Sequence, residues 1–196
     1  MKKTLSIILI CSICLFWSCI KEDRYQPKPK TYVRIDIPQY EYIVFDTATL
    51  PFTFEYPNYG KIVPNSYENN LNWFNIDFQP YGYTLYVTYI HFNNLSFLDS
   101  LISDCDKFAY ESQNKRSSGV LSKTYNNEYA NVFATTYQIK GNKVASPYQF
   151  FITDKNNNFI RASLNYNKPA NNDSLAPVIK HIEADLEHLI SSFRWK

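Results

Sequence analysis

The sequence is poor in the residues from which several common functional sites are built. Its 196 residues include only 4 Gly, 3 His, 4 Cys and 1 Met. The glycines are scattered, at positions 60, 82, 119 and 141, so the sequence has no glycine-rich turn that would bring backbone N–H groups to a phosphate. This scarcity excludes the large nucleotide-binding enzyme families.

Apolar and aromatic residues, in contrast, are abundant. The chain is 45% hydrophobic and 19% charged, and it contains 17 Tyr and 14 Phe. Such a composition can bury enough apolar surface for a stable core, and it argues against a disordered or collagen-like chain. The length fits one or at most two globular domains.

The first residues predict a secretory signal followed by a lipid attachment site. Lys2 and Lys3 precede an apolar run from Thr4 to Trp17, which is too short to cross about 30 Å of hydrocarbon as a helix. A small residue then stands directly before Cys19, as in a bacterial lipobox. We therefore interpret residues 1–18 as a lipoprotein signal peptide and Cys19 as the acylated first residue of the mature chain. The alternative is a cleaved signal that ends at an unmodified cysteine.

Removal of this signal changes the charge and cysteine counts. Loss of Lys2 and Lys3 from the 20 basic residues leaves 18, as many as the acidic residues, so no positive excess remains to bind nucleic acid. Cys11 and Cys14 also leave with the signal. Only Cys105 then stays in the folded part, which excludes an intramolecular disulfide.

Residues 19–31 are interpreted as the lipidated N-terminus and a tether. The run from Gln26 to Lys30 alternates Pro with polar residues and predicts an extended, polyproline-like spacer. Acylation at Cys19 would hold the chain in a bilayer, because each buried methylene contributes about 0.8 kcal/mol. The folded domain is thus expected a short distance from the membrane.

Residues 32–196 are predicted to form a single α+β domain. Short β-prone runs with near-alternating polarity, broken by Pro, Gly and Asn, predict an antiparallel sheet, with a hairpin turn at 79–82. The expected strands are Tyr32–Ile37, Tyr42–Phe45, Phe52–Tyr56, Trp73–Phe78, Tyr83–Ile90, Val120–Tyr125, Val132–Ile139, Tyr148–Asp154 and Phe159–Tyr166.

Two segments show helical periodicity. Apolar residues from Leu98 to Ala109 fall on one helical face, which includes Cys105, and Ser96 with Asp99 resembles a capping box. The thiol of Cys105 is accordingly expected to be buried packing material. A second apolar stripe runs from Leu175 to Phe193, in a helix that we expect Asp173 or Ser174 to cap, with Pro177 in its first turn. The fold predicted is a twisted, mainly antiparallel sheet covered by two main helices.

No metal site or cofactor is predicted. His181, Asp185 and His188 share one face of the last helix, and such a trio could in principle hold a divalent ion. Projection of the helix places them on a polar flank beside the core stripe, where solvated side chains are expected.

No catalytic residue is predicted either. The sequence lacks Gly-x-Ser-x-Gly, His-Glu-x-x-His and paired Cys-x-x-Cys motifs. Carboxylates in or beside the expected strands could supply an acid and a base, as in glycosidases, but the sequence does not show that any two approach each other. They are Asp36, Asp46, Glu55 and Asp77.

Aromatic residues between positions 56 and 89 are dense enough to supply both a core and an exposed binding surface. We single out Trp73, Tyr81 and Tyr83 as candidate contacts to a partner protein, because Tyr and Trp are favoured anchors in interfaces. The alternatives are plain sheet packing and a platform on which sugars stack.

Four blocks of the mature sequence resemble the gliding-motility lipoprotein GldD family of Bacteroidota. The blocks span nearly the whole mature chain, and the one departure is Thr31, where Gly is expected. They are Tyr25–Pro38, Phe52–Pro57 with Ile62–Pro64, Asn72–Phe78, and Asp173–Val178 continuing to Lys196. The order of elements also looks like the PsbP/Mog1-type α/β/α sandwich, a likeness that carries no function.

The resemblance implies a non-catalytic outer-membrane lipoprotein that is needed for gliding and for the type IX secretion system. Its implied partners are other gliding and secretion lipoproteins and envelope components, and Cys19 is implied as the lipid attachment site. Lys21, Glu22 and Asp23 resemble a short surface-export signal, which leaves the periplasmic face and the cell surface both open. A surface glycan-binding lipoprotein is the alternative function.

Overall fold

Alternating apolar residues build a large antiparallel sheet of seven strands. The computed structural model describes residues 39–64, 72–111, 116–167 and 172–196, all within the unit formed by residues 32–196. The strand order is β3-β4-β5-β9-β8-β7-β6. The strands are β3 Lys61–Pro64, β4 Trp73–Phe78, β5 Tyr83–His91, β6 Gly119–Asn127, β7 Val132–Lys140, β8 Tyr148–Thr153 and β9 Asn158–Tyr166.

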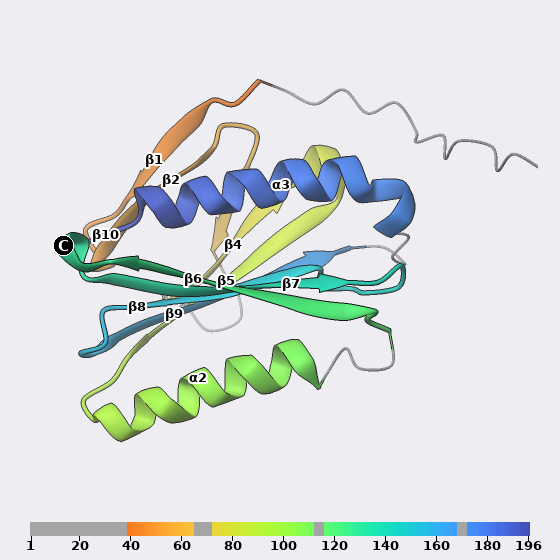
Figure 1. Ribbon diagram of the computed structural model, residues 1–196. Coiled ribbons are helices and arrows are strands. Elements are labelled where there is room, and N and C mark those ends of the chain that lie inside the picture. The colour runs from red at the N-terminus through yellow and green to blue at the C-terminus, as the bar shows by residue number, and fades with distance from the viewer. Residues whose placement is uncertain (1–38, 65–71, 112–115, 168–171) are drawn as a thin grey trace, which may run out of the picture. The chain divides into compact units, whose positions relative to one another are not determined.

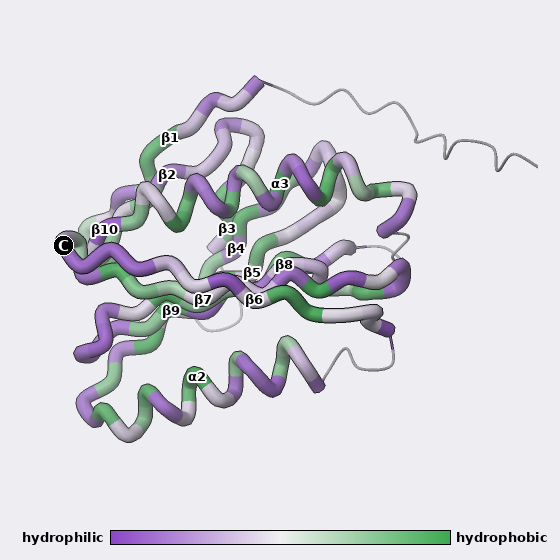
Figure 2. The backbone as a smooth tube through the Cα atoms, viewed as in Figure 1, coloured by the Kyte–Doolittle hydropathy of each residue, from purple (hydrophilic) through white to green (hydrophobic). Residues whose placement is uncertain are grey.

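A helix covers each face of this sheet (Figure 1). The helix α2 spans Leu95–Tyr110 and the helix α3 spans Asn172–Ser192. Figure 2 shows apolar and polar residues alternating along both helices, as expected where one face packs on a sheet. Two hydrophobic clusters result, one between the sheet and α3 and the other between the sheet and α2.

A second, three-stranded sheet packs against the α3 side of the molecule. It consists of β1 Tyr42–Asp46, β2 Phe52–Pro57 and β10 Arg194–Trp195, in the order β1-β2-β10. Phe52 of this sheet is fully buried, and its ring lies 5.6 Å from that of Tyr89 in the large sheet and 5.5 Å from that of Phe193 after α3. Aromatic side chains therefore join the two sheets and the end of α3.

Most of the fold expected from the sequence is confirmed. The α+β class, the antiparallel sheet and the two helices are present, and eight expected strands match to within one or two residues. The hairpin turn at Gln79–Tyr81 is closed by Gly82, whose φ of 68° suits glycine. The expected strand Tyr32–Ile37 lies outside the described residues. The short strands β3 and β10, and the division into two sheets, were not predicted.

The segment Asn94–Ser96 offers caps for α2 in the sequence, and Asn94 is the cap, because its side chain accepts a hydrogen bond from the Ser96 backbone N–H at 3.0 Å. The beginning of α3 differs from the expectation. The helix α3 already includes Asn172, so Pro177 is its sixth residue and not part of the first turn. Asn142 accepts hydrogen bonds from the first two described N–H groups of α3, through its carbonyl and its side chain.

Cys105 is buried in the cluster beneath α2, as expected from its place on the apolar face of the helix. Burial raises the pKa of its thiol to about 11. At neutral pH the side chain is therefore a small apolar group rather than a nucleophile.

Candidate functional site

The carboxylate of Asp185, in the middle of α3, is completely buried and accepts two tyrosine hydrogen bonds. The Tyr42 hydroxyl in β1 donates to Oδ1 at 2.9 Å, and the hydroxyl of Tyr59, which follows β2, donates to Oδ2. The Nε2 atom of His181, one helical turn earlier, lies 3.6 Å from Oδ2. We call these four residues the Asp185 cluster.

His181 and Asp185 are not solvated, contrary to the expectation from the helix projection. His181 is 5% exposed, and aromatic rings surround it: those of Tyr40, Tyr59 and Tyr81 lie at 4.8, 5.9 and 6.2 Å. The projection failed because the small sheet and the chain after it cover this flank of α3. An isolated helix pattern contains no information about a second layer.

His188 does not join the cluster. Its Nε2 atom lies 2.6 Å from Glu55 Oε2 in β2, and its ring stacks on Tyr42 at 3.7 Å. His181, Asp185 and His188 therefore do not converge on one point. Among the residues that the structure describes, no three His, Cys, Asp or Glu side chains gather so as to hold a metal ion.

The electrostatics of the Asp185 cluster keep its tyrosines protonated. Burial, and then the hydrogen bond to Asp185, raise the pKa of both Tyr42 and Tyr59 above that of free tyrosine. Both hydroxyls thus act as permanent donors. Because the carboxylate is sealed from solvent, the arrangement fixes β1 and the chain after β2 onto α3; it does not present an acid or a base to a substrate.

The other carboxylates considered in the sequence have separate surroundings. Asp46 lies 2.7 Å from Lys196 Nζ, Glu55 is bound to His188, and Asp77 accepts a long hydrogen bond of 3.5 Å from Thr84. Asp36 and Cys19 lie outside the described residues. Each of the three described carboxylates thus has a different partner, and the structure brings together no acid and base pair from this set.

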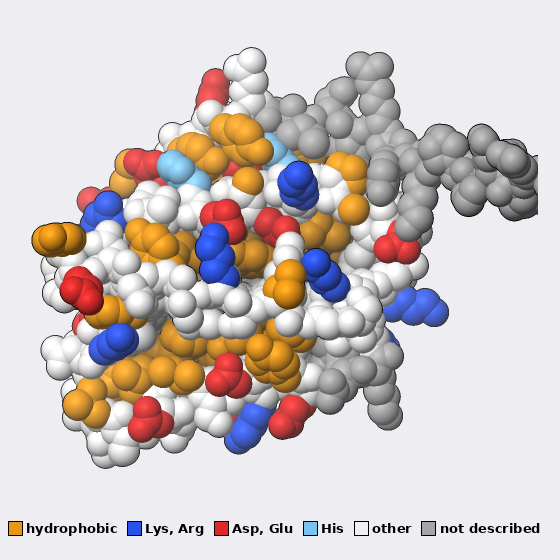
Figure 3. Space-filling view, viewed as in Figure 1, with side chains coloured by type: hydrophobic (Ala, Val, Ile, Leu, Met, Phe, Trp, Pro, Cys, Tyr) orange, Lys and Arg blue, Asp and Glu red, His pale blue; other side chains and the backbone are white. Residues whose placement is uncertain are grey.

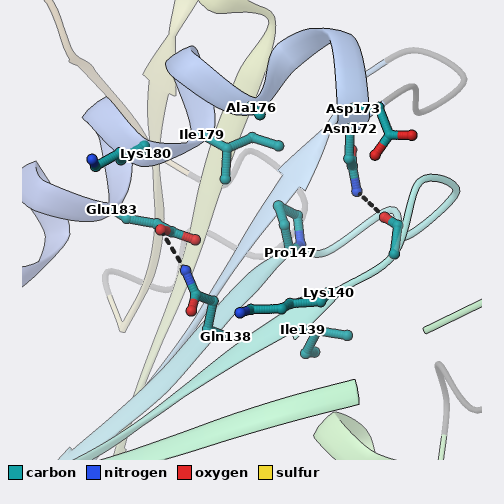
Figure 4. A pocket seen from close by; sticks show the side chains of 11 residues that line it. Gln138, Ile139, Lys140, Pro147, Asn172, Asp173, Ala176, Ile179, Lys180 and Glu183 are labelled. Atoms are coloured by element: carbon teal, nitrogen blue, oxygen red, sulfur yellow. Dashed lines mark hydrogen bonds between the residues drawn. The ribbon is translucent and has the colours of Figure 1, made fainter. Parts of the chain in front are cut away.

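A separate pocket of about 360 Å³ lies between the first half of α3 and the end of β7 (Figure 4). Its floor is largely apolar, and its charged side chains come from both elements. Glu183 points from α3 toward Gln138, whose side-chain amide donates to it at 2.7 Å. Its lining includes Gln138, Lys140, Asn172, Ala176, Lys180 and Glu183.

The predicted contact aromatics divide into two groups. Trp73 is 38% exposed at the start of β4 and remains a candidate for contact with a partner. Tyr81 and Tyr83 are buried and belong to the core beneath α3, so they do not offer a contact surface. The register of β5 turns Tyr83 toward α3, and Tyr81, in the turn before β5, packs its ring against Tyr59 and His181.

Sequence reasoning missed both the Asp185 cluster and the pocket. The cluster depends on tyrosines that are more than 120 positions away from Asp185 along the chain. One signal was available: a carboxylate directly before Leu186, inside the apolar stripe, is unusual unless the fold supplies hydrogen-bond donors. Nothing in the local pattern pointed to the pocket.

A family model described as gliding motility lipoprotein GldD matches residues 22–195. The chain belongs to the gliding motility lipoprotein GldD family. The match begins within the predicted tether and extends almost to the last residue. Membership places the chain among membrane-anchored lipoproteins of the cell envelope, and it confirms the resemblance found in the four sequence blocks.

One similar solved structure is the solution structure of cyanobacterial PsbP from Synechocystis. The match has a TM-score of 0.49 and 11% sequence identity, and it covers 82% of this chain and 95% of that chain. The likeness concerns the fold alone. No curated protein matches this member of the GldD family.

Replacement of the buried carboxylate tests the role of the Asp185 cluster. Asp185→Ala leaves two partly buried hydroxyls without their acceptor and should lower the free energy of unfolding by about 2–4 kcal/mol. Urea denaturation followed by tyrosine and tryptophan fluorescence measures this change. Asp104→Ala, on the exposed face of α2, should stay within about 0.5 kcal/mol of the unmodified protein.

A double-mutant cycle between Tyr59→Phe and Asp185→Asn should give a coupling energy above about 0.5 kcal/mol, since the two groups share one hydrogen bond. Additive effects would show that Tyr59 and Asp185 act independently and that the cluster is not a unit.

Proposed function

We propose that this GldD family member is a non-catalytic interaction module held in the outer membrane by a lipid at Cys19. In this proposal, the folded domain assembles or stabilises other gliding and type IX secretion lipoproteins. The observation that carries it is the family match over residues 22–195, which includes most of the tether and almost the whole domain.

The surface of the described domain supports a role in binding. Several large apolar side chains near β1 and on α2 are 42% exposed or more. They are Tyr40, Ile43 and Val44 near β1, and Leu95, Phe97, Phe108 and Tyr110 on α2. Exposed apolar groups that gather on one element are typical of protein contacts. No helix in the described part of the chain has the length and apolarity needed to span a bilayer.

Purification from native membranes tests the module. The tagged lipoprotein, extracted in mild detergent, should bring gliding or secretion lipoproteins with it, as identified by mass spectrometry. A control chain that keeps residues 1–31 but lacks 32–196 should lose them. Recovery of the full chain alone, or normal gliding and secretion in a clean deletion strain, would contradict the proposal.

The lipid anchor is tested by Cys19→Ala. Without an acyl chain the protein should fold but leave the outer-membrane fraction, because the tether alone has no apolar group of comparable size. Membrane fractionation with immunodetection measures the distribution. Cys11→Ala, inside the apolar run of the signal, is the matched control and should not release the protein. Full retention of the Cys19→Ala chain in the outer membrane would rule out this anchor.

One observation favours the alternative of glycan binding. Trp73 and Tyr86 are both exposed, and the register of β4 and β5 places them on the same face of the sheet, one row apart. If sugars stack on this face, the protein should migrate more slowly in gels that contain a candidate polysaccharide, and Trp73→Ala should restore normal migration. Leu121→Ala, at an exposed position on β6, is the control. Unchanged migration in every polysaccharide tried would remove this alternative.

A further inference from the structure

A pull on the lipid anchor reaches the described domain at the start of β1. The proposed anchor at Cys19 and the domain are joined by a single chain, so a force between the bilayer and anything bound to the domain passes along residues 20–38. The described residues begin at Gln39, and β1 begins three residues later, at Tyr42. The contacts of residues 40–42 therefore decide how the domain responds to such a force.

Within the small sheet, β1 is weakly attached. It is an edge strand that pairs with β2 on one side, and no other strand in the described ranges pairs with it on the other. Of its five residues only Phe45 is buried, whereas Ile43 and Val44 are 42% and 64% exposed. Its pairing with β2 starts at Tyr42, opposite Pro57. Because the bonds of an antiparallel pair lie perpendicular to the strands, a force that lifts this end loads one pair at a time.

Contacts outside the small sheet are concentrated at this same end of β1. The hydroxyl of Tyr42 donates to Asp185 in α3, and the Tyr42 ring lies 3.7 Å from the ring of His188. The ring of Tyr40 lies 4.8 Å from that of His181. In Figure 3, apolar and histidine side chains gather where β1 lies against α3. Tyr40 and Tyr42 thus contact a stretch of α3 that is about two turns long.

Glu41, between these two tyrosines, is bonded to the chain after β2. The backbone N–H of Asn58 donates to the Glu41 carbonyl at 2.9 Å, and the Asn58 side-chain amide donates to Glu41 Oε2 at 2.5 Å. Tyr59, the next residue, donates to the same Asp185 carboxylate as Tyr42. Both strands of the β1–β2 pair are therefore bonded to α3 at the end where the force enters.

The helix that receives these contacts is well packed. Ile182, one turn before Asp185, and Leu186, directly after it, are fully buried in the hydrophobic cluster between the large sheet and α3. Separating α3 from the sheet would expose all of this apolar surface to water, whereas peeling β1 away exposes mainly the ring of Phe45. The bond between Tyr42 and Asp185 thus connects a weakly held strand to a strongly held helix.

We propose that the Asp185 cluster is a mechanical clamp that transfers force on the membrane tether from β1 to α3. This inference rests on the proposed function, because the force arises only if the domain is anchored at one end and bound to a partner elsewhere. Without the clamp, such a force would peel β1 from β2 and open the small sheet. With it, the force must first separate Tyr42 from Asp185 and His188, so the domain keeps its fold while a partner pulls on it.

Single-molecule force spectroscopy on the unacylated mature chain tests the clamp. One handle is attached to the thiol of Cys19 and the other to Glu187→Cys, on the exposed face of α3; Cys105 is buried and does not compete. Tyr42→Phe removes only the hydroxyl that donates to Asp185. At constant force we expect this variant to release β1 about three to ten times faster, as the loss of one hydrogen bond implies.

Tyr59→Phe is the matched control. It removes the same kind of hydroxyl from the same carboxylate, but Tyr59 follows β2 and does not lie between the tether and β1. The two variants should lower the free energy of unfolding in urea by similar amounts, whereas under force on Cys19 Tyr59→Phe should speed the release of β1 less than about twofold. Equal acceleration by both variants would mean that the cluster only stabilises the fold, and no acceleration by Tyr42→Phe would mean that its bond carries no force. Either result overturns the clamp.

A second pair of handles changes the path of the force. Glu187→Cys is combined with Tyr129→Cys, which lies fully exposed in the turn between β6 and β7, and with Cys19→Ser, so that β1 is not loaded. Here Tyr42→Phe should change the unfolding rate less than about twofold. An effect as large as that measured through the tether would also overturn the clamp.

The outcome is separable from that of the proposed function, because these measurements need neither a lipid nor a partner. If the Cys19→Ala chain stays in the outer membrane, the anchor at Cys19 is wrong, while a faster release of β1 in Tyr42→Phe still supports the clamp. If the anchor and the partners are confirmed but Tyr42→Phe releases β1 no faster, the clamp is wrong and the interaction module stands.

Discussion

The packing of Phe52 holds the parts of this domain together. Its ring contacts aromatic rings from each of its neighbours: Phe45 at 6.3 Å in β1, Tyr89 at 5.6 Å in the large sheet, and Phe193 at 5.5 Å after α3. A fully buried aromatic ring removes a large apolar area from water, and ring contacts add about 0.5–1.5 kcal/mol each. The position of the small sheet against α3 follows from this one packing site.

The Asp185 cluster depends on that position. Only when the small sheet lies over α3 do the hydroxyls of Tyr42 and Tyr59 reach the carboxylate. Burying a carboxylate is costly, and the hydrogen bonds offset the cost without adding much net stability. The cluster instead selects one arrangement, because any shift of β1 along α3 would leave buried polar groups unpaired. Apolar packing provides the stability, and the polar network defines the position of β1 along α3.

Sequence patterns predicted the elements of this fold better than its layers. Alternation and turn residues located β4, β5, β7 and β9. Within each of these strands, the alternation of apolar and polar residues already shows which face is buried and which is exposed. The strand β10 has only two residues, and its pairing with β2 depends on a partner about 140 positions away. Distance along the chain also explains why the local pattern places His181 and Asp185 in solvent and offers Tyr81 and Tyr83 as contacts. Local periodicity reports whether a face is apolar, but it does not report which other segment covers a polar group.

The order β1-β2-β10 also bears on how the chain matures. Strand β2 lies between the first strand of the described domain and the last two residues that form a strand, with Arg194 opposite Thr53 and Trp195 opposite Phe52. Contacts between such distant segments form late, because a long loop must close before they contribute. The domain therefore cannot complete its small sheet until Arg194 and Trp195 have been synthesised. Until then, Phe52 and Thr53 of β2 lack their strand partners, and the edge of β2 that β10 covers stays open.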